Sequence, residues 1–342
     1  MIAGIDLFCG VGGLTHGLQQ AGIDVKLGID VDPACKFPYR SNNKAQFIHR
    51  DVIQLSGTDI RRVWGDAKIT LLAGCAPCQP FSTYSRASRK SRPNQKWDLV
   101  RAFARLVGES QPDLVTMENV SQLVRHKVFQ EFLEGLSGYH IWYSVVDCSE
   151  YGVPQTRKRL VLMASKLGPI SLAKQRLSKP VTVGQVIRRL PALNAGDVDG
   201  FDPIHHACHL SPLNLKRIQA SKPGGSWRDW PEELLANCHR KASGETYPSV
   251  YGRMEWDSLA PTITTQCFGY GNGRFGHPEQ DRAITLREAA MLQTFPRSYK
   301  FLPKDEKVIF YILGRLIGNA VPVKLAKSIG CEFIKHVKAH ST

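Results

Sequence analysis

The sequence predicts an α/β fold with a doubly wound sheet and a second, smaller domain. Over residues 1–166, short strand-like runs alternate with helical patterns of about 10–15 residues, which is typical of βαβ units around a parallel sheet. After Lys166 the pattern breaks, and residues 167–260 are irregular and rich in Pro, Gly and Trp. The length of 342 residues suits one large domain with a smaller one appended.

The expected strands follow one another as IAGIDLFC, VKLGID, AQFIHRD, ITLLAGC, DLVTMENV, YHIWYSVVD and RLVLMAS. A helical pattern follows each of the first five. Within residues 167–260 the clearest helical piece is DWPEELLANC. Residues 261–342 return to regular structure, with helices expected at TLREAAMLQTF and VPVKLAKSIGCEFIKHV. The second of these places its apolar residues on one face: Val323, Ala326, Ile329, Phe333 and Val337.

The net charge of +15 is unevenly distributed. Residues 151–196 contain nine Lys or Arg and no acid, and residues 83–97 contain five basic residues and no acid. Such blocks repel themselves unless a polyanion covers them, which favours nucleic acid over a merely solvated basic surface. A membrane surface is disfavoured because neither block has an apolar helical face.

The compartment expected from the sequence is the cytoplasm. No stretch approaches the ~18 consecutive apolar residues of a membrane span, and the first residues lack the basic region and cleavage site of a secretory signal. The nine cysteines are odd in number and irregularly spaced. They therefore indicate free thiols in a reducing environment.

A glycine-rich turn follows the first strand as Phe8-Cys9-Gly10-Val11-Gly12-Gly13. Glycines here let a ligand approach the backbone and the helix N-terminus, and Asp30 at the end of the second strand could bind a ribose diol. The turn is also compatible with a plain strand–helix connection. A dinucleotide fingerprint would require glycine where Thr15 stands. The pattern therefore favours a ligand with adenosine but without a pyrophosphate.

The stretch GCAPCQPFS holds Cys75 and Cys78 at the end of a strand. A zinc site would need further ligands, and the candidates have no common ligand spacing: His205, His206, Cys208, His209, Cys238 and His239. A redox pair would open a helix, whereas Pro77 and Pro80 flank Cys78. Cys75 is expected to be a buried structural thiol. Cys78 lies at the carboxyl edge of the sheet, where open α/β folds bind ligands.

Two further strand ends point to the same edge. Glu118 closes an apolar strand in Glu118-Asn119-Val120, and it becomes a general-acid candidate if burial favours its neutral form. The segment QTRKR at residues 155–159 precedes the last strand and could equally be an ordinary basic turn.

Together these segments resemble the DNA (cytosine-5)-methyltransferases of bacterial type over most of the chain. DLFCGVGG is similar to the first motif of that family, GIDVDP to the second and HRDV to the third, although the family more often has Glu at the place of Asp30. APCQPFS resembles the catalytic motif, ENV the sixth, QTRKR the eighth, LREAAMLQTFP the ninth and GNAVP the tenth. Eight short motifs in the family's order make chance agreement very improbable.

The resemblance implies a Rossmann-like methyltransferase sheet in residues 1–166 and a target-recognition domain in residues 167–260. Residues 261–342 would carry the last two motifs and return to the catalytic domain. It also implies the catalytic residues. The Cys78 thiolate would add to carbon 6 of cytosine, protonated Glu118 would donate to ring nitrogen 3, and Arg157 and Arg159 would hold the base oxygen and an adjacent phosphate.

By the same resemblance the cofactor is S-adenosylmethionine, and no metal is needed. Phe8 would stack on the adenine, Asp30 would bind the ribose and Asp51 the adenine amine. Asn319 and Val321 would line the methionine end. The remaining cofactor contacts implied are Gly10, Gly12, Gly13 and Pro77.

The expected partner is double-stranded DNA, with the chain as a monomer and with no membrane contact. A flipped cytosine is implied because its carbon 6 face is blocked inside a duplex. A cognate restriction endonuclease acting separately would suit this reaction. Two alternatives are an enzyme that methylates transfer RNA, from a branch of the same family, and a catalytically silent DNA-binding subunit. The target sequence cannot be read from the chain, because phosphate contacts carry no sequence information.

Overall fold

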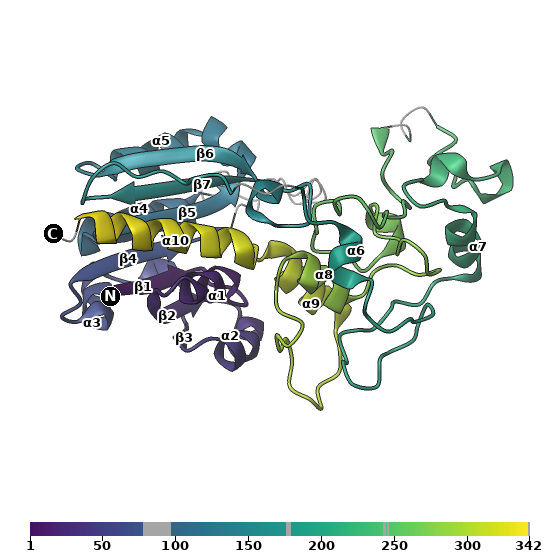
Figure 1. The fold of residues 1–342 in the computed structure, drawn as a ribbon, viewed down its shortest axis with the longest axis horizontal. Helices are drawn as coiled ribbons and strands as arrows, with labels where there is room; N and C mark the ends of the chain where they lie inside the picture. The colour runs from purple at the N-terminus through teal and green to yellow at the C-terminus, as the bar shows by residue number, and fades with distance from the viewer. Residues whose placement is uncertain (78–96, 176–178, 242–243, 245, 341–342) are drawn as a thin grey trace. The chain divides into compact units, whose positions relative to one another are not determined.

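The computed structural model describes residues 1–77, 97–175, 179–241, 244 and 246–340 (Figure 1). The chain divides into two compact units. The first comprises Met1–Tyr151, Lys158–Arg176 and Val321–Thr342, and the second comprises Gly152–Arg157 and Leu177–Ala320. The expected functional ranges 1–166, 167–260 and 261–342 stay a prediction.

The first unit is built on a seven-stranded sheet with the order β3-β2-β1-β4-β5-β7-β6. Its strands are β1 (Ile2–Leu7), β2 (Asp24–Asp30), β3 (Gln46–His49), β4 (Ile69–Gly74), β5 (Leu114–Val120), β6 (His140–Asp147) and β7 (Lys158–Ser165). The order reverses between β1 and β4, and ligands of open α/β sheets bind at such a point.

The expectation of a parallel sheet is correct for β1 to β5 only. β7 pairs antiparallel with both β5 and β6. The central run of β7 is buried throughout, as in a parallel strand, so its direction could not be read from its apolar pattern. Only the 3-10 turn Cys148–Tyr151 lies between β6 and β7, with no α-helix, and the short connection suits an antiparallel pair.

Helices cover both faces of this sheet. The helices of this unit are α1 (Gly13–Gln20), α2 (Lys36–Asn42), α3 (Gly57–Trp64), α4 (Asp98–Ser110), α5 (Lys127–Glu134) and α10 (Val323–His340). α3, α4 and α5 share one apolar core with the strands. The yellow helix α10 lies beside α1 in Figure 1, where Gly17 brings the α1 backbone against Val323 and Ala326.

The expected apolar face of α10 is confirmed. Val323, Ala326, Ile329 and Phe333 are buried and Val337 is half-buried. No helix in the described part of the chain is both long and apolar enough to cross a membrane.

The second unit contains α6 (Val183–Ile187), α7 (Pro212–Ala220), α8 (Leu286–Leu292) and α9 (Phe310–Asn319). The helix expected at DWPEELLANC is wrong: only two 3-10 turns form there, Trp227–Asp229 and Glu232–Leu234. Trp230 between them is extended, as expected for a residue before proline. The sequence analysis did not predict α7, although Ser211 caps it and proline opens it.

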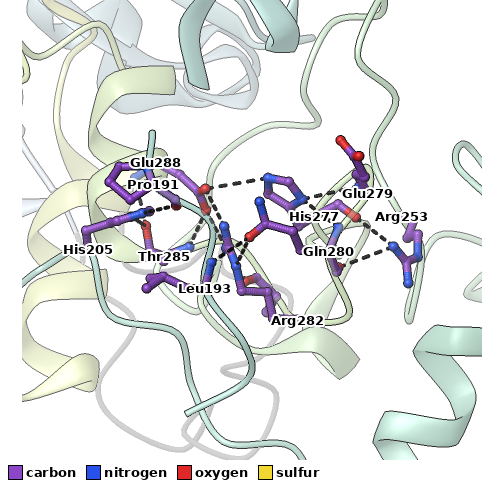
Figure 2. Close-up of polar contacts among 11 residues, drawn as sticks. Pro191, Leu193, His205, Arg253, His277, Glu279, Gln280, Arg282, Thr285 and Glu288 are labelled. Carbon is purple, nitrogen blue, oxygen red and sulfur yellow. Dashed lines mark hydrogen bonds and ion pairs between the residues drawn. The ribbon is translucent and has the colours of Figure 1, made fainter. Parts of the chain in front are cut away.

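The described residues of the second unit form no sheet, only isolated β-bridges between loops. A buried network of polar side chains connects these loops (Figure 2). Arg282 donates to both carboxylate oxygens of Glu288 at 2.8 Å. Nε2 of His205 donates to the carbonyl of Pro191, and Nδ1 lies 3.0 Å from the hydroxyl of Thr285, which caps α8. Arg253 donates to the carbonyls of residues 277 and 280. The network thus links loops that lie far apart in the sequence.

Candidate active site

The carboxyl ends of β1, β4 and β5 meet at one edge of the sheet. Leu7 pairs with Gly74, and Gly74 pairs with Met117. The residues that follow these strand ends, Phe8 and Cys75, and the neighbouring Glu118 therefore lie along one edge. This is the edge at which open α/β sheets bind their ligands.

Glu118 is buried at this edge, with only 3% of its surface exposed. One carboxylate oxygen, Oε1, lies 3.1 Å from Nε of Arg159. The other oxygen, Oε2, accepts a hydrogen bond from the thiol of Cys75 at 2.9 Å. Buried charges require such partners. Arg159 reaches Glu118 because β7 lies beside β5, with Arg159 opposite Val120.

Cys75 was expected to be a buried structural thiol, and the structure differs. Its side chain is half-buried and donates to Glu118. β4 ends at Gly74, so Cys75 lies beyond the strand and turns toward the neighbouring strand β5. Asn119 also contacts this turn, because its amide donates to the carbonyl of Ala76 at 3.0 Å. The sequence analysis assigned no task to Asn119.

The glycine-rich turn after β1 has a backbone that few side chains tolerate. Gly10 has φ 51° and Gly12, the N-cap of α1, has φ 90°. The carboxylate of Asp30 accepts from the backbone N–H of Gly10 at 2.8 Å and of Asp32 at 2.9 Å. Burial raises the pKa of Asp30 above its usual range. Each carboxylate oxygen can accept more than one hydrogen bond, so ribose hydroxyls fit this donor set.

A second buried acid lies beneath the same turn. Thr15 donates to Asp6 at 2.7 Å and contacts the hydroxyl of Tyr39 at 2.9 Å, and all three are buried. Burial raises the pKa of Asp6 to about 7. Gly28 makes room for the Tyr39 ring, since a Cβ there would lie 2.2 Å from it. Thr15, at the position of the missing dinucleotide glycine, thus fixes the start of α1 to β1. The sequence analysis missed this network.

The other predicted cofactor residues lie in both units. Asp51 is half-buried and caps the 3-10 turn Val52–Gln54. Phe8 is half-buried and Pro77 is exposed. Val321 is buried in the first unit, whereas Asn319 is exposed at the end of α9 in the second.

Arg157 is buried in the second unit, with 2% of its surface exposed. Its guanidinium donates to the main-chain carbonyls of Ile263, Gly318 and Ala320. The predicted contact with a base oxygen or phosphate stays a prediction.

The described cysteines form no disulfide, and none of the described His, Cys, Asp and Glu residues gather into a group of three or more that could hold a metal ion. His205 is engaged by Thr285 and Pro191, and His239 stacks on Trp227 at 4.3 Å. Burial raises the pKa of Cys208 to about 11 and of Cys267 to about 12, so neither is a reactive thiol. Cys78 and residues 83–96 of the basic loop lie outside the described residues.

Residues 2–335 match the family model of the C-5 cytosine-specific DNA methylases. The chain belongs to this family. It is 52% identical over 332 residues to the type II methylase M.HgiDII of Herpetosiphon aurantiacus, covering 95% of this chain and 93% of the relative. It is 32% identical to the type II methyltransferase M1.HphI of Haemophilus parahaemolyticus, covering 97% and 86%.

The fold agrees with that of a protein encoded within an Escherichia coli prophage and described as a DNA modification methyltransferase. The two structures have a TM-score of 0.76 at 23% identity, over 99% of this chain and 100% of the other. The predicted family, the Rossmann-like fold and the class of enzyme, a DNA (cytosine-5-)-methyltransferase, are confirmed. The roles of individual residues stay predictions.

Proposed function

We propose that this methylase transfers a methyl group from S-adenosylmethionine, the usual donor of its family, to carbon 5 of a cytosine in a short duplex DNA sequence. The observation that carries the proposal is the buried Glu118, paired with Arg159 at the edge where the glycine-rich turn also lies. A carboxyl and a guanidinium at one strand edge can bind the polar side of a flipped pyrimidine. Restriction–modification would be the biological setting, with a separate endonuclease.

The Cys78 thiolate would form a covalent bond to carbon 6, which makes carbon 5 nucleophilic. A free thiol is only a few per cent ionised at neutral pH, so nearby positive charge from Arg159 would favour the thiolate. Glu118, once protonated, would donate to ring nitrogen 3 and withdraw electrons from carbon 6. After carbon 5 is methylated it loses its proton, and elimination of the thiolate restores the aromatic ring.

The methyl donor supplies an electrophilic methyl on a sulfonium. Asp30 would hold its ribose, Phe8 and Asp51 would hold its adenine, and Asn319 would bind its methionine end. The fit is supported by the open space at Gly10, where a Cβ would meet nothing within 4 Å. The positive net charge supports DNA as the substrate. Residues 83–97 would close over the flipped base, and residues 167–260 would choose the target.

The test is transfer of labelled methyl groups to duplex DNA and, in parallel, to transfer RNA. We expect transfer to DNA only, abolished in Cys78→Ser. A duplex with 5-fluorocytosine at the target should trap a covalent protein–DNA adduct, because fluorine cannot leave as the proton does. Bisulfite sequencing of DNA from expressing cells gives the target. Absence of adduct and label with the folded wild-type chain would refute the proposal.

A further inference from the structure

The carbonyls at the end of α9 are held by buried side chains from other parts of the second unit. Gln293 donates to the carbonyls of Ile317 at 2.9 Å, Ala320 at 3.2 Å and Gly318 at 3.4 Å. Arg157 donates to Gly318 at 3.3 Å and to Ala320 at 3.4 Å. The last carbonyls of a helix lack partners within the helix, and here the side chains of two other segments supply them.

A third buried side chain orients these two donors. The amide nitrogen of Gln155 donates to the side-chain oxygen of Gln293 at 2.9 Å, which directs the Gln293 nitrogen toward α9. The amide oxygen of Gln155 accepts from the N–H of Ile263 at 2.9 Å, and Arg157 binds the carbonyl of Ile263 at 3.0 Å. We call Gln155, Arg157 and Gln293 the amide–guanidinium clamp. All three are at most 2% exposed.

Close backbone packing also fixes α9 against the segment that the clamp binds. A Cβ at Gly318 would lie 2.4 Å from the backbone of Thr264, and one at Gly314 would lie 2.8 Å from the carbonyl of Thr265. α9 therefore lies directly against the segment that begins at Ile263. Asn319 lies between the clamped carbonyls of Gly318 and Ala320, and its own residue surface is exposed.

We propose that the amide–guanidinium clamp is a positioning device that fixes the Gly318–Ala320 backbone, so that Asn319 meets the methionine end of S-adenosylmethionine. A helix end that needs only solvation is satisfied by water or by a C-terminal glycine. Two buried side chains hold the carbonyls on both sides of Asn319, and a third orients one of them, which matches the support that a ligand-binding side chain needs. The inference rests on the proposed function, because it takes the ligand of Asn319 from there.

The test is a double-mutant cycle on S-adenosylmethionine binding, measured by calorimetric titration without DNA. Asn319→Ala should raise the Kd about tenfold, and Arg157→Lys, which keeps the charge but not the planar fork, should raise it about fivefold or more. Since the clamp acts through Asn319, the double variant should bind no more than about twofold worse than Asn319→Ala alone. If Arg157→Lys does not fold, the second variant is Gln293→Asn, which shortens the side chain that carries the amide.

The matched control is Thr285→Ala in the other buried network of this unit. It removes the helix cap and the contact with His205, so it should lower the melting temperature while the Kd stays within twofold of wild type. The inference would be overturned if the effects on the Kd were additive in the double variant. It would also be overturned if the Kd were unchanged in a folded clamp variant or in Asn319→Ala. Failure of the proposed function would differ, because the wild type would then bind S-adenosylmethionine without labelling duplex DNA.

Discussion

Each unit of the protein contains a fully buried acidic side chain, and the surroundings shift the pKa values of the two in opposite directions. Asp6 in the first unit has the hydroxyl and the backbone N–H of Thr15 as its hydrogen-bond donors. Glu288 in the second unit has a bidentate guanidinium, Arg282, and the backbone N–H of Thr285. Burial raises the pKa of Asp6 to about 7. For Glu288 burial also acts to raise the pKa, but Arg282, His277 and the N–H of Thr285 together outweigh it and lower the pKa to about 2.

The difference follows from how each unit is held together. The first unit has a seven-stranded sheet with apolar cores, so a neutral buried acid can serve there as a local hydrogen-bonding group. The described part of the second unit has no such sheet. There the ion pair itself connects loops, through Gln280, His277 and Arg253. Four variants test this contrast.

The largest effect is expected for Glu288→Gln. The substitution keeps the shape but leaves the Arg282 guanidinium buried without a counter-charge, which costs about 3–5 kcal/mol of unfolding free energy. Urea denaturation at neutral pH measures it. The control is Glu232→Gln, which removes only a surface pair with Arg240 and should leave the unfolding midpoint within error. Equal effects of the two variants would contradict the role of the buried pair.

Removing a buried charged group usually lowers stability, but Asp6→Asn should raise the unfolding free energy at alkaline pH. The folded pKa of Asp6 is raised from 3.8 to about 7, so the folded protein binds more protons than the unfolded chain between these values. Stability therefore falls as pH rises through this window. Asn resembles the protonated acid, so the variant should exceed wild type at pH 8 by about 2–4 kcal/mol. Urea unfolding curves of both proteins at pH 4 and pH 8 measure this difference. If the unfolding free energies of the two proteins change in parallel with pH, the prediction is wrong.

His277 should give the second unit the opposite pH dependence. Burial, together with Arg282 and Arg253, lowers the pKa of His277 from 6.5 to about 4. The unfolded chain then binds more protons between these values, so this stability is complete above about pH 6.5 and is lost as pH falls toward 4. His277→Asn keeps an acceptor for the N–H of Gln280. It should reduce the loss of unfolding free energy between pH 6.5 and pH 4 by about 2 kcal/mol.

Amide hydrogen exchange at pH 7 and pH 5 distinguishes the units. In wild type, the lower pH should reduce the protection factors of amides in the second unit relative to those in the first, after correction for the pH dependence of the intrinsic exchange rate. A uniform change across the chain, or an unchanged slope in the variant, would show that His277 does not set the pH response.

The smallest effect is expected for Thr15→Val. It removes the hydrogen bond to Asp6 at nearly constant volume and should cost about 1–2 kcal/mol. Since that bond lowers the pKa of Asp6, its loss should also move the Asp6 carboxyl titration to higher pH, which carbon NMR detects. Thr15→Ser retains the hydroxyl and should titrate as wild type. An unmoved titration in Thr15→Val would refute the contact.

Local sequence determined the strand-forming runs, the apolar face of α10 and the order of the motifs. These depend on spacings of a few residues, because a strand repeats every two residues and a helix every 3.6. The amino-acid pattern alone therefore placed Glu118 at a strand end and the glycines directly after β1. The same is true of the family resemblance, which rests on contiguous segments.

Only the tertiary structure decided which side chains meet. Glu118 meets Arg159 because β7 runs antiparallel beside β5, and the apolar run of β7 carried no sign of its direction. The contacts of Arg157 with Gly318 and of Gln155 with Gln293 join residues more than 130 positions apart. Basic and amide side chains look alike in sequence whether they face DNA or a buried carbonyl. Burial and the partners within reach settle that choice, and both arise only when the chain has folded.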